Sequence, residues 1–211
     1  MRRASYILAG LALMAAAVAT AGGRELDTYR ANRGKIEQPA VALARRAVEI
    51  RLGIKPTQPA PPCGSLLKSK AAVFVTISKN GRRRGCKGSF EPATQRLCDE
   101  IARAAVGAAT MDVRYRPLRS SELKDVIFSV SIVGAPRQVR DAGQYPPGRY
   151  GLLLRSGSKS GVLLPGEAKT RSWRLAEAKR QAGVKSGEQF ELYIFEAVTF
   201  AEHPSSRRMK P

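Results

Sequence analysis

The sequence predicts an α+β fold, in which a largely antiparallel sheet is flanked by helices. Two glycine-containing turns, Asn80-Gly81 and Gly157-Ser158, each join segments that read as strands, as in β-hairpins. Helical segments stand between these hairpins at irregular intervals, so the chain lacks the regular βαβ alternation of a parallel sheet. The 211 residues suffice for one core, or for two small lobes that share one.

The first 21 residues have the layout of a secretory signal peptide. Arginines at positions 2 and 3 precede an uncharged apolar run at 6–18, and the small residues 19–21 form a cleavage site. The apolar run is short for a membrane span, and an uncleaved anchor helix is the alternative. We therefore expect an exported protein, periplasmic or secreted, with no transmembrane segment in the mature chain. That chain would begin with a polar leader at 22–37.

Helical spacing and strand alternation place the first elements of the domain. Residues 39–53 repeat apolar side chains at helical spacing and end at a glycine, which predicts a helix. Residues 71–78 alternate as a strand, and Asn80-Gly81 favours a two-residue hairpin loop after it. The return strand is expected at 82–86, ending in a turn around Gly88.

The same signals, with proline and glycine as breaks, place the remaining elements. These are a proline-rich connector at 55–65, a helix at 92–110, a strand at 125–133, a hairpin at 150–166, a helix at 170–182 that carries Trp173, a single long strand at 190–200, and a basic tail at 201–211.

Composition points to anionic partners and excludes common metal sites. The formal net charge of +20 attracts anionic small molecules, lipid headgroups or envelope polymers, whereas nucleic acid is not expected for an exported protein. A coding bias toward arginine would explain the same charge without any partner. Three cysteines and one histidine do not supply paired CxxC or HExxH zinc sites, so no metal or organic cofactor is expected. His203 lies in the polar tail, a poor place for a catalytic base.

The stretch RRRGCKGS, residues 82–89, holds the residues that the sequence singles out for chemistry. A two-residue hairpin loop would set Cys86 on the same buried face as Val75 and Ile77, with Arg84 beside it. Either Arg84 and Cys86 floor an internal cleft, or Arg84 makes a structural ion pair and Cys86 is inert core. The adjacent glycines would let the backbone approach a ligand and present N–H groups to an anion.

Two questions about the cysteines stay open on the residues alone. Arg84 and Lys87 would favour the thiolate of Cys86 if they lie near the sulfur. The candidate bases for such a nucleophile are four acidic residues without a spacing signature: Glu91, Asp99, Glu100 and Asp112. In an oxidising compartment two of the three cysteines (Cys63, Cys86 and Cys98) would pair, and the sequence does not say which.

The hairpin VFVTISKNGRRRGCKGSFEP resembles the signature of the AMMECR domain family. The segments ALARRAVEIRLG, VRYRPLRSSELKDVIFSVSIVGAP, YGLLLRSGSKSGVLLP, the helix around Trp173 and LYIFEAVTF match in the same order. The resemblance covers residues 38–200 and implies an α+β fold of two small lobes with a cleft bordered by the motif. It implies no established activity, although related proteins are linked to Memo-type and radical-SAM proteins.

Two features depart from that family pattern. Arg83 and Lys87 stand where the family usually has apolar residues, and strand parity predicts that they share the face of Phe74 and Thr76. The signal peptide also argues against a partnership with cytosolic radical-SAM chemistry.

These observations leave three hypotheses, of which the first is preferred. The first is an exported domain that binds an anionic or polar small molecule with the motif residues Arg84, Gly85, Cys86, Lys87, Gly88 and Ser89. The second is an enzyme in which Cys86 is the nucleophile and Arg84 stabilises negative charge. The third is a cationic protein held on anionic envelope material. The oligomeric state is open.

Overall fold

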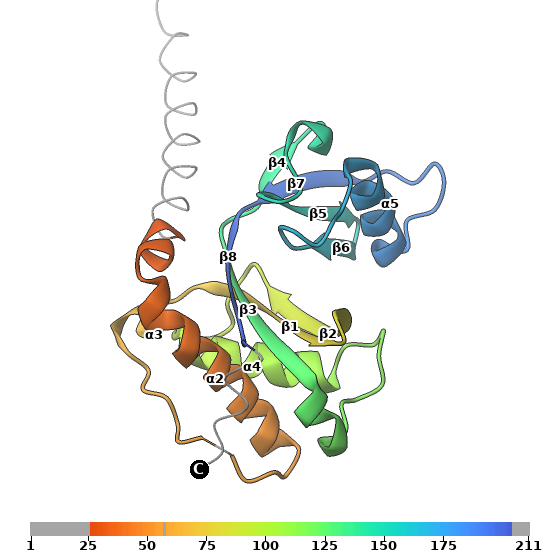
Figure 1. The fold of residues 1–211 in the computed structure, drawn as a ribbon. Helices are drawn as coiled ribbons and strands as arrows, with labels where there is room; N and C mark the ends of the chain where they lie inside the picture. The colour runs from red at the N-terminus through yellow and green to blue at the C-terminus, as the bar shows by residue number, and fades with distance from the viewer. Residues whose placement is uncertain (1–25, 57, 204–211) are drawn as a thin grey trace, which may run out of the picture. The chain divides into compact units, whose positions relative to one another are not determined.

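The computed structural model describes residues 26–56 and 58–203, which fall into two compact units (Figure 1). One unit is built on residues 32–133 and resumes at residue 197, and the other contains residues 134–196. Each unit contains a four-stranded antiparallel sheet with helices beside it. The predicted α+β fold is confirmed. The cleft implied by the family resemblance stays a prediction.

The first unit has the strand order β2-β1-β3-β8. Its strands are β1 (Ala72–Lys79), β2 (Arg82–Ser89), β3 (Val126–Val133) and β8 (Ala197–Ala201). Its helices are α2 (Arg33–Arg51), the short α3 (Ser65–Lys68), α4 (Leu97–Thr110) and the 3-10 helix η1 (Ser120–Asp125).

Helices α2 and α4 pack on one face of this sheet, α4 over β1 and β2 and α2 over β3 and β8. Val73, Val75 and Ile77 of β1 point toward the helices and are at most 1% exposed. Because successive strand residues alternate between faces, the opposite face carries Phe74 and Thr76. The helices therefore cover one side of the sheet; on the other side Phe74 is buried and Thr76 is half-buried.

The second unit has the strand order β4-β7-β5-β6, with α5 (Arg171–Ala182) packed on β5 and β6. Its strands are β4 (Arg137–Val139), β5 (Gly151–Ser156), β6 (Lys159–Leu163) and β7 (Glu191–Phe195), and η2 (Ala142–Gln144) follows β4. The buried guanidinium of Arg174 donates to the carbonyls of Tyr150, Tyr145 and Ala142, and so fastens α5 to the loop before β5. Burial lowers the pKa of Arg174.

Several boundaries differ from those expected. Helix α2 begins at Arg33 rather than at residue 39, because Ile36 extends its buried stripe by one turn. The proline-rich connector runs into the short helix α3. Helix α4 begins at Leu97, since the buried carboxylate of Glu100 accepts hydrogen bonds from the amides of residues 93 and 94 and holds them in a loop. The Asn80-Gly81 turn is confirmed, with positive φ at both residues.

The single strand expected at 190–200 is wrong, because it divides at Glu196 into two strands of different sheets. The residues before Glu196 form β7 in the second unit, and the residues after it form β8 in the first. Glu196 accepts hydrogen bonds from Arg30 and Arg149, and its carbonyl accepts from the amide of Gly134. The alternating pattern runs through both strands and so does not mark the change of sheet.

Gly85→Ala is expected to destabilise the first unit. A Cβ at Gly85 would lie 2.2 Å from the carbonyl oxygen of Ala108, so α4 would have to move off the sheet. Overpacking of this kind costs about 1–3 kcal/mol. Gly34→Ala is the control, because nothing lies within 4 Å of a Cβ at that helical position. Urea unfolding measures both, and equal stability of the two variants would contradict the close helix approach.

Candidate functional site

A β-bulge in the first hairpin decides where Cys86 lies. At the turn, Lys79 pairs with Arg82 as expected, but the register shifts by one between Ile77 and Ser78. Arg84 is the extra residue of the bulged strand. Cys86 therefore pairs with Thr76, and the predicted pairing with Val75 is wrong, because a slip of one residue moves every later side chain to the other face.

Beyond the bulge, Cys86 and Lys87 have the opposite orientations from those expected, and the strand continues to Ser89 rather than ending at Cys86 in a turn around Gly88. Gly85 faces α4 and lies against Ala108, whereas Cys86 lies on the face that α2 and α4 leave uncovered. Across that face, Thr76 is followed by Ser129 and Ala201 in neighbouring strands. The predicted burial of Cys86 beside Val75 and Ile77 is thus wrong, and the cysteine is half-buried.

The Cys86 thiol is held by polar neighbours. The hydroxyl of Thr76 donates a hydrogen bond to Sγ at 3.4 Å. The backbone amide of Cys86 donates to Oδ2 of Asp112 at 2.8 Å. Cys86 is outside any disulfide, because the bridge forms between Cys63 and Cys98 and joins the connector to α4.

Asp112 fixes a cation, Arg114, beside the thiol. Its carboxylate accepts Nε and Nη2 of Arg114, each at 2.8 Å, and also the amide of Arg114 at 3.2 Å. Burial of this carboxylate, which is 8% exposed, opposes its charge, but hydrogen bonds from Arg114 and from the amide of Cys86 outweigh burial and lower the pKa of Asp112. The hydrogen bond with Asp112 raises the pKa of Arg114, and the nearby Cys86 sulfur adds to that rise.

The arrangement leaves Asp112 unsuited to be a general base. Each carboxylate oxygen already accepts two N–H groups, and the lowered pKa disfavours proton uptake. Of the four acidic residues proposed as bases, Asp112 accepts from the amide of Cys86, Asp99 pairs with Arg96, and Glu100 is buried with Arg103.

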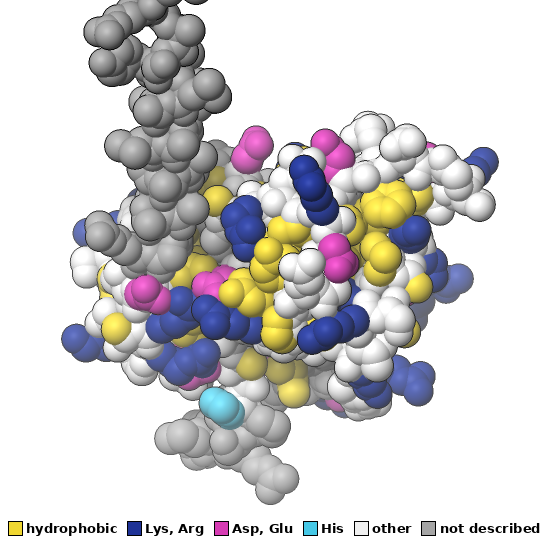
Figure 2. Space-filling model, turned by 90° about the horizontal axis from the view of Figure 1, so that it is seen from above, with side chains coloured by type: hydrophobic (Ala, Val, Ile, Leu, Met, Phe, Trp, Pro, Cys, Tyr) yellow, Lys and Arg dark blue, Asp and Glu magenta, His cyan; other side chains and the backbone are white. Residues whose placement is uncertain are grey.

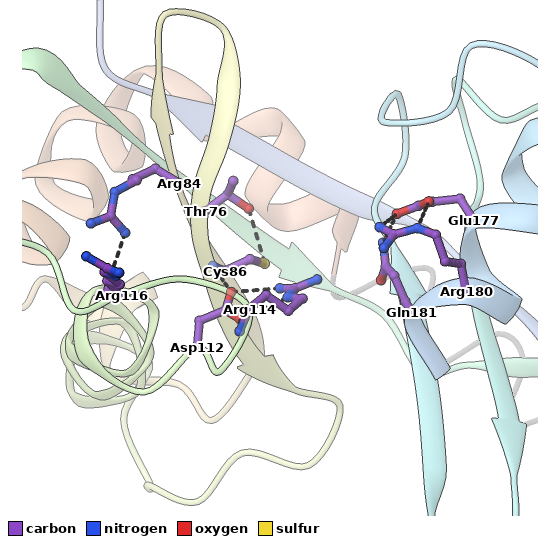
Figure 3. Close-up of polar contacts among 9 residues, drawn as sticks. All are labelled: Thr76, Arg84, Cys86, Asp112, Arg114, Arg116, Glu177, Arg180 and Gln181. Atoms are coloured by element: carbon purple, nitrogen blue, oxygen red, sulfur yellow. Dashed lines mark hydrogen bonds and ion pairs between the residues drawn. The ribbon is translucent and has the colours of Figure 1, made fainter. Parts of the chain in front are cut away.

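Arg84 points away from the thiol and ties down the loop that follows α4 (Figure 3). Its Nε and Nη2 donate to Glu122 at 3.0 Å each, its Nη1 donates to the carbonyl of Arg116 at 2.8 Å, and its Nη2 also reaches the carbonyl of Pro117. The hydrogen bond from Arg84 lowers the pKa of Glu122. The expected placement of Arg84 and Cys86 side by side is therefore wrong, and the alternative of a structural ion pair is confirmed.

The other motif residues are dispersed. Lys87 pairs with Val75 on the helix side and lies against Gly107, so its predicted placement on the face of Phe74 and Thr76 is wrong, whereas Arg83 does pair with Ser78 on that face. A Cβ at Gly88 would meet the Phe74 ring, and the Ser89 hydroxyl accepts the amide of Glu91. Whether these residues bind a ligand stays a prediction.

Sequence reasoning missed Thr76 and Arg114 as neighbours of the thiol. Arg114 follows α4 in the segment VRYRPL, which matched the family pattern but was not assigned a role. The signal that could have found it is the Asp-x-Arg spacing, in which an aspartate two residues before an arginine can hold its guanidinium.

Positive and negative side chains are mixed on the face that Figure 2 shows, and the described residues contain no cluster of metal-binding side chains. Figure 2 shows Lys and Arg side chains scattered over the face in view, with Asp and Glu side chains among them. Within the described residues, no group of three or more His, Cys, Asp and Glu side chains is placed to hold a metal ion. The same part of the chain contains no helix long and apolar enough to cross a membrane.

The predicted signal peptide at 1–21 and most of the tail at 201–211 lie outside the described residues.

Comparison with known proteins gives a consistent family match. The sequence pattern of the AMMECR1 family matches residues 41–200. A protein of Thermotoga maritima is 36% identical over 167 residues, covering 75% of this chain and 95% of that protein. A protein of Thermofilum pendens is 36% identical over 190 residues, covering 77% and 87%. The crystal structure of the uncharacterized protein PH0010 from Pyrococcus horikoshii superposes with a TM-score of 0.64 at 30% identity, covering 78% of this chain and 90% of that one.

Asp112→Asn is expected to lower the stability of the first unit at neutral pH by about 1–2 kcal/mol, because charged hydrogen bonds are lost but the partly exposed Arg114 is screened by solvent. The pKa of Asp112 is lowered by folding, so its contribution is present above the unfolded pKa and lost as the pH falls through the folded value. The stability difference between wild type and variant should therefore shrink below about pH 4.

Asp99→Asn serves as the control for this pH series, since Asp99 is an exposed carboxylate that also pairs with an arginine. Urea unfolding from pH 7 to pH 3 measures the difference. A pH-independent loss in Asp112→Asn would contradict the charged role of the carboxylate.

Proposed function

The chain belongs to the AMMECR1 family. We propose that it is an exported binding domain, which holds a small anionic or polar ligand at Cys86 and Arg114. The observation that carries this proposal is the guanidinium of Arg114. Asp112 occupies its Nε and Nη2 edge, while Nη1 meets no acceptor within the described residues.

A guanidinium held in this way is already oriented to bind an anion. Its side chain is 37% exposed, and its orientation is fixed before a ligand arrives, which reduces the entropy lost on binding. The hydroxyl of Thr76 and the thiol of Cys86 lie beside it and add polar contacts. A ligand carboxylate or phosphate would accept the remaining N–H groups of Arg114.

The Arg114 site replaces the site expected at Arg84. The donors of Arg84 are directed at Glu122 and at two backbone carbonyls, so a ligand would have to break those hydrogen bonds. Binding is favoured over catalysis because the carboxylate nearest to Cys86 already accepts four N–H groups. A cysteine-dependent reaction would need a base from the ligand or from solvent.

Two observations support export. The signal-peptide pattern occupies the first 21 residues, and the Cys63–Cys98 disulfide suits an oxidising compartment. A net charge of +20 would draw anionic ligands toward the domain.

Thermal unfolding with a panel of small carboxylates and phosphates tests the binding proposal. A ligand at about a hundredfold excess over its Kd stabilises the fold by about 2.7 kcal/mol, which raises Tm by about 5–10 °C. Arg114→Gln should abolish the shift. Arg96→Gln, which removes an exposed arginine that is also paired with an aspartate, should keep it. Absence of any shift across the panel, or a full shift in Arg114→Gln, would refute the proposal.

Alkylation of Cys86 tests the electrostatic setting of the thiol. Iodoacetamide should label Cys86 alone in the folded protein, because Cys63 and Cys98 are paired. Arg114→Gln and Thr76→Val should each slow labelling at pH 7 severalfold, because both remove stabilisation of the thiolate. Mass spectrometry follows the rate, and unchanged rates in both variants would show that neither group acts on the sulfur.

N-terminal sequencing of the protein recovered from the periplasm or medium of an expressing bacterium tests export. A start near Gly22 is expected. Recovery from the cytoplasm alone, with Met1 intact, would exclude export.

A further inference from the structure

On the side of strand β2 opposite Cys86, the first unit has a hollow lined by residues of α2, α4 and β2. Its volume is about 380 Å³, within the range of small-molecule sites. The lining residues are Ala47 of α2, Ala102, Arg103, Val106 and Gly107 of α4, Met111 after α4, and Lys87 of β2. The sequence did not single out this place, and of the motif residues only Lys87 lines the hollow.

Short side chains create the hollow. Ala47, Ala102 and Gly107 leave space that longer side chains would fill. The aliphatic stem of Lys87 lies across the gap, since a Cβ at Gly107 would lie 2.9 Å from Cγ of Lys87. The lysine stem therefore forms one wall of the hollow, and its ammonium extends to the exposed rim.

The rim is cationic and the floor is apolar. The ammonium of Lys87 forms no ion pair within residues 26–56 and 58–203. Arg103 also lines the hollow, but its charge is matched by the buried carboxylate of Glu100. The net charge at the rim is therefore that of Lys87.

Apolar surface continues beyond the hollow and stays exposed to solvent. Met111, which lines the hollow, is 62% exposed. Ile50, one turn after Ala47 on α2, is also exposed. Large apolar side chains left in water beside a concave apolar floor are typical of a binding surface.

We propose that this hollow binds a single-chain amphiphile with an anionic head group, such as a fatty acid. The acyl chain lies on Ala47, Ala102, Val106 and Met111, and the head group pairs with the ammonium of Lys87. An apolar chain removes the exposed floor from water, and the charge of the head group matches the rim. This proposal does not rest on the Cys86 and Arg114 site, because the two lie on opposite faces of β2.

Decanoate below its micellar concentration is the probe, with binding measured by calorimetry on the mature protein. Decanoate is expected to bind, whereas acetate, which has the head group without the chain, is expected not to bind at this site. Lys87→Met keeps the stem but removes the charge, and should weaken binding about threefold to tenfold. Ala102→Leu fills the hollow and should abolish binding. Lys70→Met, which removes an exposed lysine outside the lining, should bind as wild type does.

Each other outcome overturns the proposal in a distinct way. Failure of wild type to bind decanoate, or equal affinity in Lys87→Met or in Ala102→Leu, would exclude the hollow as the site. Arg114→Gln should lose only the binding that acetate shares with decanoate, and loss of all decanoate binding there would place the carboxylate at the Cys86 face instead. Binding to vesicles of anionic phospholipid without binding to decanoate would replace the single-chain occupant by a bilayer surface.

Discussion

One extra residue in strand β2 decides which face of the sheet each later residue of that strand occupies. The bulge at Arg84 moves Cys86 from the helix-covered face of the sheet to the open one, and it moves Lys87 the other way. Two carboxylates hold this arrangement from outside the sheet: Glu122 accepts the side chain of Arg84, and Asp112 accepts the amide of Cys86. The segment from 112 to 122 thereby covers the outer edge of β2, the kind of strand edge that would otherwise be open to pairing with another chain.

The carboxylate of Asp112 has a structural role and also a role at the candidate site. Asp112 fixes both the backbone at Cys86 and the guanidinium of Arg114, so a structural anchor and a candidate ligand contact share one buried group. This explains why the guanidinium of Arg114 can lie beside the thiol of the edge strand β2 without a catalytic base. It also explains why Arg84, the arginine most conspicuous in the sequence, contributes to the loop after α4 instead.

Much of the fold could be predicted from the sequence, and the failures have physical causes. Local patterns could be predicted: the Asn80-Gly81 turn, the alternation in β1, and the helical spacing of apolar residues in α2 and α4. The bulge could not be predicted, because residues 82–84 are all arginine and have no apolar alternation that would fix the register of the hairpin. Gly85 was assigned to ligand approach, yet its lack of a side chain lets α4 lie against the sheet at Ala108. The division at Glu196 depends on contacts with residues distant in sequence, which no local pattern records.

The central claim is the register of the first hairpin, and a cross-strand disulfide measures it directly. Residues that oppose each other in an antiparallel pair lie close enough to be bridged. Thr76→Cys should form a disulfide with Cys86 under mild oxidation, and Val75→Cys should not, as read by non-reducing peptide mapping. A bridge from Val75→Cys with none from Thr76→Cys would mean that the hairpin has no bulge, and that Cys86 belongs to the core.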